Sequence, residues 1–531
     1  MIKKTILCLC LLCLSLGQAC RAEAENEEGV SLSRGGVVEL RDASLGFLNL
    51  SLVDAVVLAL KTNLDVDISR IDPLIEDKDI SIEKAPFDPV LKMSGEIRKD
   101  ETPLNSIFVT GTAPVDFLIQ SHEGDAELSM LTPIGATVAM EYDFIKRART
   151  PSGGVAFDPA TDTFIEGRIT APLLKKFGIF YNRSKIYMAQ NDKKKSIYAL
   201  RGTAIDIANE VQIAYWDLVK GIENLKVAHK SLQRAQEFMR NNELQVQAGI
   251  LAPIDLAVDK EEVALREEQI IIAEDEVQDR EDKLKLLMNF LNPDVASWLS
   301  GITIVPLDKP VWELRDVDLN DSIRVALGNR PEIFEKKLEL DNADIETRRK
   351  KNELLPQLDI EGGVRFSGLG KAWNDSQDST FSTHFQSEYA KISLELPIGL
   401  RKERAEYAKA KYEERRAKLE FTKQEQEVIF DVRDAARQVQ TTKELVKSTK
   451  KTLEAAQERL DAEGKKYKVG RTTNLEVFRA QESLAIQEAR RNKALGDYHI
   501  ALGELEAAKG TLLERLNIIL EQQALGNDLI Y

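Results

Sequence analysis

The C-terminal part of the chain lacks proline and repeats every seven residues, and this pattern constrains the fold more than any other feature. Residues 398–531 contain no proline. Two rows of side chains recur at seven-residue intervals, a bulky row and, offset by four, a mostly small or polar row: Val432, Val439, Val446, Leu453, Leu460 and Tyr467, then Val428, Ala435, Thr442, Thr449, Ala456 and Glu463. Strict seven-residue spacing predicts an α-helical coiled coil. Residues 403–468 as one helix would be roughly 100 Å long, which exceeds the need of a single globular domain.

This helix is predicted to turn tightly and return. Gly470 suits a helix C-cap, and Thr473 or Asn474 suits the next N-cap, so residues 403–520 read as a helical hairpin. The first half is predicted to contain a similar helical hairpin. Residues 182–248 are predicted helical, Gly249 lies in the turn, and the chain returns as helix to about residue 290.

Other segments also occur twice. Residues 52–66 match residues 319–333 at an offset of 267, and residues 169–174 match the strand-to-helix junction at residues 394–399. The chain therefore reads as two structural repeats, residues 45–290 and 317–520, joined by a proline-containing linker at residues 291–316. Each repeat is expected to contain a short helix, strands, a long helix, a glycine tip and a second long helix.

Strands are predicted at residues 86–172 and 356–398, where glycine, proline and threonine interrupt alternating apolar residues. Leu358, Ile360, Val364 and Phe366 alternate with polar residues, which is typical of a barrel strand between lipid and water. Polar residues 367–389 suit an external loop. A soluble β-hairpin remains the alternative for any one strand, and the number of strands that residues 86–172 contribute stays open.

The N-terminus has the pattern of an export signal. Lys3 and Lys4 precede an uncharged, mostly apolar run at residues 5–16, which is too short to span a bilayer. Cleavage is expected after residues 1–24, at Ala22–Glu23–Ala24, or before Cys20, which would then carry a lipid. All four cysteines lie in the first 20 residues, so no disulfide framework is expected downstream.

Charge and motif content exclude several functions. The chain has 73 basic and 88 acidic residues, a net charge of −15, which disfavours nucleic acid as the main partner. The four histidines are scattered without metal-ligand spacing, and no phosphate loop or nucleophile motif occurs. The sequence therefore predicts no enzyme activity, no metal and no cofactor.

The whole layout resembles the TolC-like family of outer-membrane efflux proteins, the outer membrane factors, over residues 45–520. The most specific segment is residues 467–480, and residues 172–178 resemble the family's proline-marked strand exit. The resemblance implies a mixed α+β membrane protein. Its transmembrane strands would form one shared barrel in a homotrimer, and its coiled-coil hairpins would form a tunnel across the periplasm.

The resemblance also implies a function and partners. The protein would be a passive exit duct in the outer membrane, for a tripartite efflux or type I secretion system. A periplasmic adaptor would dock on the tips at Gly249 and Gly470, and an inner-membrane pump would supply the energy. Two rivals remain: a periplasmic adaptor, which also carries a coiled-coil hairpin, and a soluble structural coiled-coil protein. The sequence identifies neither the cargo nor the pump.

Gate residues carry over from the family by position. Asp255 and Glu476 lie six residues past the tip glycines, and Tyr467 lies three before Gly470. Asp255 and Tyr467 would form a latch between the hairpins, and Glu476 a carboxylate ring in the trimer. Arg479 stands where the family often has a second acid, so Glu476 could be neutralised. Both acids also lie in first helical turns, where a carboxylate stabilises the helix dipole by roughly 0.3–1 kcal/mol.

Overall fold

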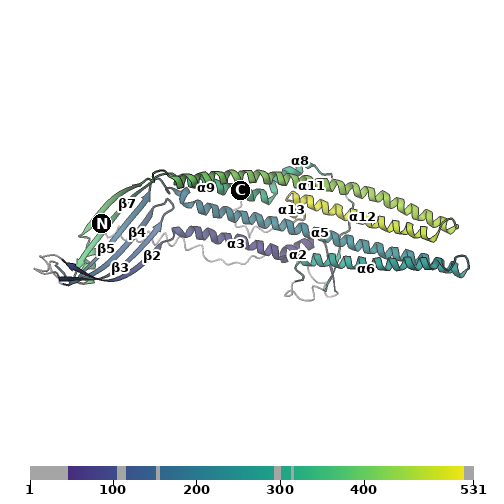
Figure 1. Cartoon of the computed structure of the whole chain (residues 1–531), viewed down its shortest axis with the longest axis horizontal. Coiled ribbons are helices and arrows are strands. Elements are labelled where there is room, and N and C mark those ends of the chain that lie inside the picture. Colours follow the sequence, from purple (N-terminus) through teal and green to yellow (C-terminus); the bar gives the residue numbers. More distant parts are fainter. Residues whose placement is uncertain (1–45, 105–114, 151–155, 292–300, 313–315, 519–531) are drawn as a thin grey trace.

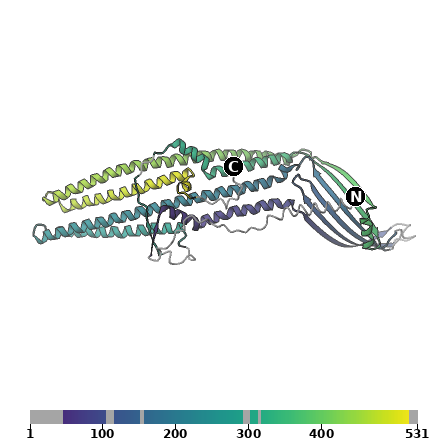
Figure 2. The same cartoon turned by 180° about the vertical axis from the view of Figure 1, so that it is seen from behind.

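The molecule is a long bundle of helices with a curved β-sheet at one end (Figures 1 and 2). This computed structural model describes residues 46–104, 115–150, 156–291, 301–312 and 316–518. The predicted signal peptide and Cys20 lie outside the described residues. Among the described helices, none is both long and apolar enough to cross a membrane.

The first half begins with a short strand and ends with two long helices. Its elements are β1 (Phe47–Leu50), α2 (Leu52–Thr62), α3 (Leu64–Lys84), η3 (Ala85–Phe87), β2 (Val90–Leu104), β3 (Val115–Leu131), β4 (Thr137–Thr150), β5 (Ala160–Pro172), α5 (Ile179–Gln247) and α6 (Asp255–Leu287).

The second half runs in a similar order with fewer strands. Its elements are β6 (Thr303–Pro306), α8 (Leu319–Asn329), α9 (Pro331–Glu353), β7 (Gln357–Gly370), α10 (Trp373–Phe381), β8 (Gln386–Glu395), α11 (Arg401–Lys468), α12 (Asn474–Ala508) and α13 (Leu512–Arg515). A helix, α10, lies within residues 367–389, which the sequence suggested were a plain loop.

Six antiparallel strands form one sheet in the order β2-β3-β4-β5-β7-β8, so the two halves join between β5 and β7. Side chains alternate between the two faces of a strand. One face carries apolar residues from every strand, among them Met93, Leu128, Met140, Ile169, Val364 and Ile392, all exposed in the single chain. The other face is charged, and Arg168 and Arg365 pair there with Glu141 and Glu166. The sheet is therefore amphipathic across its whole width.

The seven-residue rows of α11 lie at its contacts with neighbouring helices. Val439 and Val446 are buried with Tyr498 of α12, and Val428 and Val432 are buried with Ala326 of α8. Next to the sheet, α3, α5, α9 and α11 follow one another side by side. Farther from the sheet the order is α6, α5, α12 and α11. The helices α5 and α11, of 69 and 68 residues, run through both levels.

Two helices that the sequence did not suggest, α3 and α9, continue the predicted short helices after a break. Asn63 has extended backbone, ends α2 and caps α3, because its side chain accepts hydrogen bonds from the amides of Asp65 and Val66. In the second half, Pro331 is the first residue of α9, and a residue before proline is disfavoured in helical conformation. Arg330 is accordingly extended, with ψ of 123°.

The predicted linker at residues 291–316 contains a strand that the sequence did not suggest. Strand β6 lies within it and pairs in parallel with β1, from Phe47–Thr303 to Leu50–Pro306. Ile302 and Ile304 are buried with Leu48 and Leu50 in the largest apolar cluster, which also includes residues of α2, α5 and α6. A strand of only four residues carries too short an alternation to stand out in a sequence.

Tyr215 of α5 connects α5 to the end of β1 and to the segment that follows β6. Its fully buried hydroxyl lies 3.1 Å from the carbonyl oxygen of Leu50 and 2.8 Å from Asp308 Oδ2, and it accepts the Asp308 N–H at 3.2 Å. Asp308 Oδ2 also accepts the amide of Leu52 at 2.7 Å. Burial raises the pKa of Tyr215, so the hydroxyl keeps its proton.

Tyr215→Phe is expected to lower the free energy of unfolding by about 1–3 kcal/mol, because it removes a buried group that pairs with both the carboxylate and the amide of Asp308. Thermal unfolding in detergent, followed by circular dichroism, measures this. Tyr198→Phe is the control, since Tyr198 lies on the same helix and stacks on Phe334 through its ring. Equal destabilisation by the two variants would contradict this role of the Tyr215 hydroxyl.

Candidate functional site: the paired helical tips

The two hairpins end side by side, at the end of the molecule farthest from the sheet (Figure 1). Both turns have the same backbone geometry. The N–H of Gly249 donates to the carbonyl of Val246, and that of Ile250 to Gln245. Gly470 and Arg471 make the same two bonds to Tyr467 and Lys466. This is the Schellman motif, which needs a left-handed residue, and the φ angles of Gly249 and Gly470 are 74° and 71°.

A hydrogen bond joins the two hairpins just inside the tips. Tyr467 at the end of α11 donates its hydroxyl proton to Oδ1 of Asn242 in α5, at 2.9 Å. The ring of Tyr467 lies 5.0 Å from that of Phe238, which in turn makes an edge contact at 5.0 Å with Phe478 of α12. Aromatic packing and one polar bond therefore connect three helices at this level.

The same bond continues into a buried polar chain. Asn242 Nδ2 donates to Asp259 Oδ2 of α6 at 2.7 Å, and Asn474 Nδ2 of α12 donates to Asp259 Oδ1 at 2.9 Å. Asn242 and Asp259 are 0% exposed. Each of the four helices α5, α6, α11 and α12 thus contributes one side chain to a single network.

The carboxyl of Asp259 is the centre of this network. Burial raises its pKa, while the hydrogen bonds from Asn242 and Asn474 stabilise the charged form and oppose that rise. The charges of Asp255 and Glu243 raise the pKa further. A buried carboxylate is costly unless it is hydrogen-bonded, and here both of its oxygens accept an amide N–H.

Asp255 and Tyr467 do not form the direct bond that the sequence suggested. The Tyr467 hydroxyl has Asn242 as its acceptor, and Asn474 Nδ2 donates to the backbone oxygen of Asp255 at 3.2 Å. Asp255 still acts on Tyr467 electrostatically, because burial and then the charges of Asp259 and Asp255 raise the pKa of the phenol. The tyrosine reaches across to the other hairpin, but its acceptor lies one helix earlier in the chain.

Glu476 and Arg479 pair on the exposed side of α12. Arg479 Nη1 lies 2.6 Å from Glu476 Oε1, and both side chains are exposed to solvent in the single chain. Opposite charges three residues apart are neighbours on one helical face. The structure thus contains the neutralising pair that the arginine at residue 479 suggested.

Sequence reasoning missed Asn242 and Asp259, and it treated Asn474 only as a helix cap. A signal existed, because these residues continue buried seams. Asp259 is followed on α6 by buried Val263, Arg266 and Ile270, and Asn242 follows buried Ala235 by seven residues. A polar residue at a seam position of a coiled coil commonly specifies register or partner choice. The seven-residue pattern of the first hairpin is weak, so the sequence did not reveal that Asn242 and Asp259 occupy seam positions.

Comparison with known proteins now adds to this geometry. Residues 322–511 match the family model of the outer membrane efflux protein. The fold of nearly the whole chain is that of solved outer-membrane channels. CmeC of Campylobacter jejuni is 15% identical, with 92% of this chain and 90% of CmeC covered and a TM-score of 0.61. MtrE of Neisseria gonorrhoeae in its open state is 16% identical (87% of this chain and 89% of MtrE covered, TM-score 0.60), and CusC is 14% identical (88% of this chain and 94% of CusC covered, TM-score 0.61). No curated protein matches the chain.

The second half of the chain therefore contains a domain of the outer membrane efflux protein family. The resemblance found in the sequence is thereby confirmed, and so is the prediction of an exit duct in the outer membrane. The solved channels, at 14–16% identity, show the fold of this chain alone. What the tips of this efflux protein do depends on its own side chains.

Tyr467→Phe and Asn242→Ala are each expected to raise channel conductance in planar bilayers, because each removes the bond between the hairpins. One such bond contributes about 0.5–1.5 kcal/mol, a change of up to roughly tenfold in the open-to-closed ratio per chain. The double variant should match Asn242→Ala alone, because that variant already removes the acceptor of the Tyr467 hydroxyl, together with the bond from Asn242 to Asp259.

Tyr407→Phe is the matched control, as it lies on α11 far from the tip. Additive effects of the two tip variants would contradict a shared bond. Asp255→Ala separates this network from the latch that the family implies. If Asp255 were the acceptor during gating, its loss would raise the conductance as much as the loss of the Tyr467 hydroxyl.

Proposed function

We propose that three copies of this chain form one passive export duct, with a shared β-barrel in the outer membrane and a helical tunnel in the periplasm. The observation that carries this proposal is that, within the described part of the chain, both edges of the sheet and of the helical layer lack a neighbouring strand or helix. In the sheet, β2 and β8 are the edges. Unpaired backbone groups cannot face lipid, so the sheet needs partners on both sides.

The helical layer is open in the same way. Near the sheet its outermost helices are α3 and α11, and farther away they are α6 and α11. The free side of α3 exposes a row of apolar residues that water alone would not favour: Ile68, Ile71, Leu74, Ile75 and Ile82. Contiguous apolar surface of this kind marks an interaction site.

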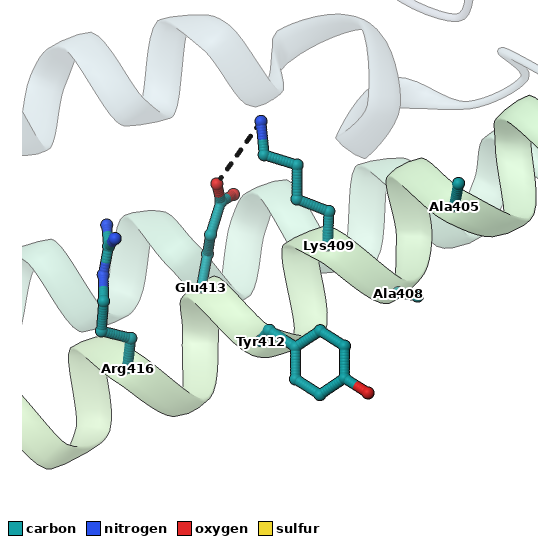
Figure 3. Close-up of a pocket in the computed structure, with 6 residues that line it drawn as sticks. All are labelled: Ala405, Ala408, Lys409, Tyr412, Glu413 and Arg416. Carbon is teal, nitrogen blue, oxygen red and sulfur yellow. Dashed lines mark ion pairs between the residues drawn. The ribbon is translucent and has the colours of Figure 1, made fainter.

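The opposite edge offers a complementary shape. A shallow hollow of about 510 Å³ lies on α11, where Ala405 and Ala408 leave room beside Tyr412 (Figure 3). It is bordered by Lys409 and Glu413, whose charged groups lie 3.7 Å apart. Small residues let a neighbouring helix approach closely. An α3 edge seated on the next chain's α11 edge is a head-to-tail contact, and such contacts close into rings.

The two halves of the chain support a duct with repeated symmetry. Each half contributes a pair of helices, then strands, then a hairpin. We infer two structural repeats, residues 45–290 and 317–520, in which the first has gained two strands. In a trimer these repeats would surround the axis as six similar units, and the charged sheet face would line a watery lumen while the apolar face meets lipid.

The duct is proposed to open when a periplasmic adaptor docks on the tips at Gly249 and Gly470, with energy from an inner-membrane pump. Tripartite efflux and type I secretion both use such an arrangement, as the family resemblance implies. A soluble coiled-coil protein would have no use for a sheet that exposes apolar residues from all six strands on one face. A periplasmic adaptor is disfavoured by the six strands that lie together beyond the helices.

Ala408→Trp is expected to abolish or strongly reduce the trimer, because a bulky side chain would fill the hollow that the next chain occupies. Ala408 is exposed in the single chain, so the fold itself should be unaffected. Gel mobility of unheated and heated membrane extracts measures the trimer. Lys418→Trp, on another exposed side of α11, is the control and should assemble. Assembly of the Ala408 variant at the normal level would refute this subunit contact.

Arg479→Ala is expected to make the channel more cation-selective and more sensitive to block by divalent cations. Its loss leaves Glu476 unpaired, and three such carboxylates near the axis would attract cations. Reversal potentials in a salt gradient measure selectivity. Arg490→Ala removes the same charge about three helical turns away and should leave selectivity unchanged. Equal selectivity of the Arg479 variant and the parent channel would place Glu476 away from the constriction.

A further inference from the structure

The short helix α10 rests on the apolar face of the sheet, at the end remote from the long helices (Figure 2). Thr163 of β5 makes hydrogen bonds of 2.7 Å with the hydroxyls of both Ser376 and Thr380. Gly368 of β7, the register partner of Thr163, has no side chain where Ser376 and Thr380 approach. These contacts are buried, so α10 is packed against the sheet and is not a loop segment without contacts to it.

The face on which α10 lies can be assigned from alternation. Thr163 shares its face with Ile165 and Ile169, whereas Glu166, which pairs with Arg365, lies on the other face. In a barrel the apolar face meets lipid and the charged face meets water. Given the proposed barrel, on which this inference rests, α10 is therefore attached to the outer wall and not inside the lumen.

The height of α10 on that wall follows from strand length. Leu358, Ile360, Val364 and Phe366 form the lipid-side row of β7, a span of nine residues that ends just before Gly368. A transmembrane strand needs about 9–11 residues. The helix thus begins where the hydrocarbon layer ends, at the level of the outer-leaflet headgroups.

The two aromatic residues of α10 lie on one side of the helix. Trp373, Gln377 and Phe381 are spaced by four and share one side. Trp373 Nε1 and Gln377 Nε2 donate to the hydroxyl of Tyr142 at 3.1 and 3.0 Å. Tyr142 pairs with Ile165, one row nearer the membrane centre than Thr163, so this side faces the bilayer. Trp373 is 47% exposed and Phe381 is 60% exposed in the single chain, which leaves both free to contact lipid.

The opposite side of α10 is polar. Asp375 and Asp378 are exposed and lie away from Tyr142 on the helical wheel. Aromatic residues concentrate at membrane interfaces, and a helix with one apolar and one charged side lies in the interface plane. We propose that α10 is an interfacial helix, which binds the boundary between the acyl chains and headgroups of the outer leaflet through Trp373 and Phe381.

Spin-label accessibility tests this proposal in the full-length channel. Single cysteines replace Phe381 and, as the matched control on the same helix, Asp378, in a Cys20→Ser background. Each labelled protein is reconstituted in vesicles of phosphatidylethanolamine and phosphatidylglycerol. The ratio of oxygen accessibility to nickel-chelate accessibility is expected to be several-fold higher at residue 381 than at residue 378, because oxygen partitions into lipid.

Two results would overturn the proposal. High nickel accessibility at residue 381 would place α10 in water, and low accessibility to both reagents would mean that protein covers it. A third label, Val364→Cys, separates these failures from a failure of the barrel. Val364 lies on the apolar face of β7, so it should favour oxygen whatever α10 does. Preference for the nickel chelate at residue 364 would count against the proposed function itself.

Discussion

Helices of nearly 70 residues impose the main constraint on this molecule, because one chain cannot surround them. Each has an apolar seam that must be covered along its whole length, and α5 contacts helices from both halves of the chain. At both levels of the bundle the four helices form a layer and not a closed core. A layer buries its two faces poorly and leaves its edges unsatisfied. The sheet, which continues that layer, also has uncovered edges, so assembly with further copies of the chain would cover the edges of both the layer and the sheet.

Much of this could be predicted because the signals were long. Two rows of six residues at seven-residue spacing predicted α11, and glycines followed by capping residues predicted both tips. The elements that were missed were short or depended on contacts distant in sequence. Strand β6 has four residues, and its pairing with β1 joins residues more than 250 positions apart. The docking of α10 depends on Thr163, which lies in the other half of the chain.

The tip was predicted only in part, for a physical reason. Positional transfer correctly indicated that Tyr467 contacts the first hairpin, since the length of the hairpins determines which residues meet. It could not indicate the acceptor, because Asn242 and Asp255 are both near and side-chain packing decides between them. Phe238 positions the tyrosine ring, and the buried carboxylate of Asp259 orients the amide of Asn242. Such a choice depends on contacts among four helices, which no single segment encodes.

The polar character of the tip is consistent with a closure that must be reversible. An apolar seam gains stability from every contact, and opening it would expose all of its surface to water at once. A seam held by Asn242, Asp259 and Tyr467 exchanges internal hydrogen bonds for bonds to water, so its net contribution is small although its geometry is strict. Polar residues at seam positions give up stability and retain register. Farther from the tip, Val439 and Val446 of α11 are buried against α12 within the same hairpin, so the proposed opening would leave that apolar packing intact.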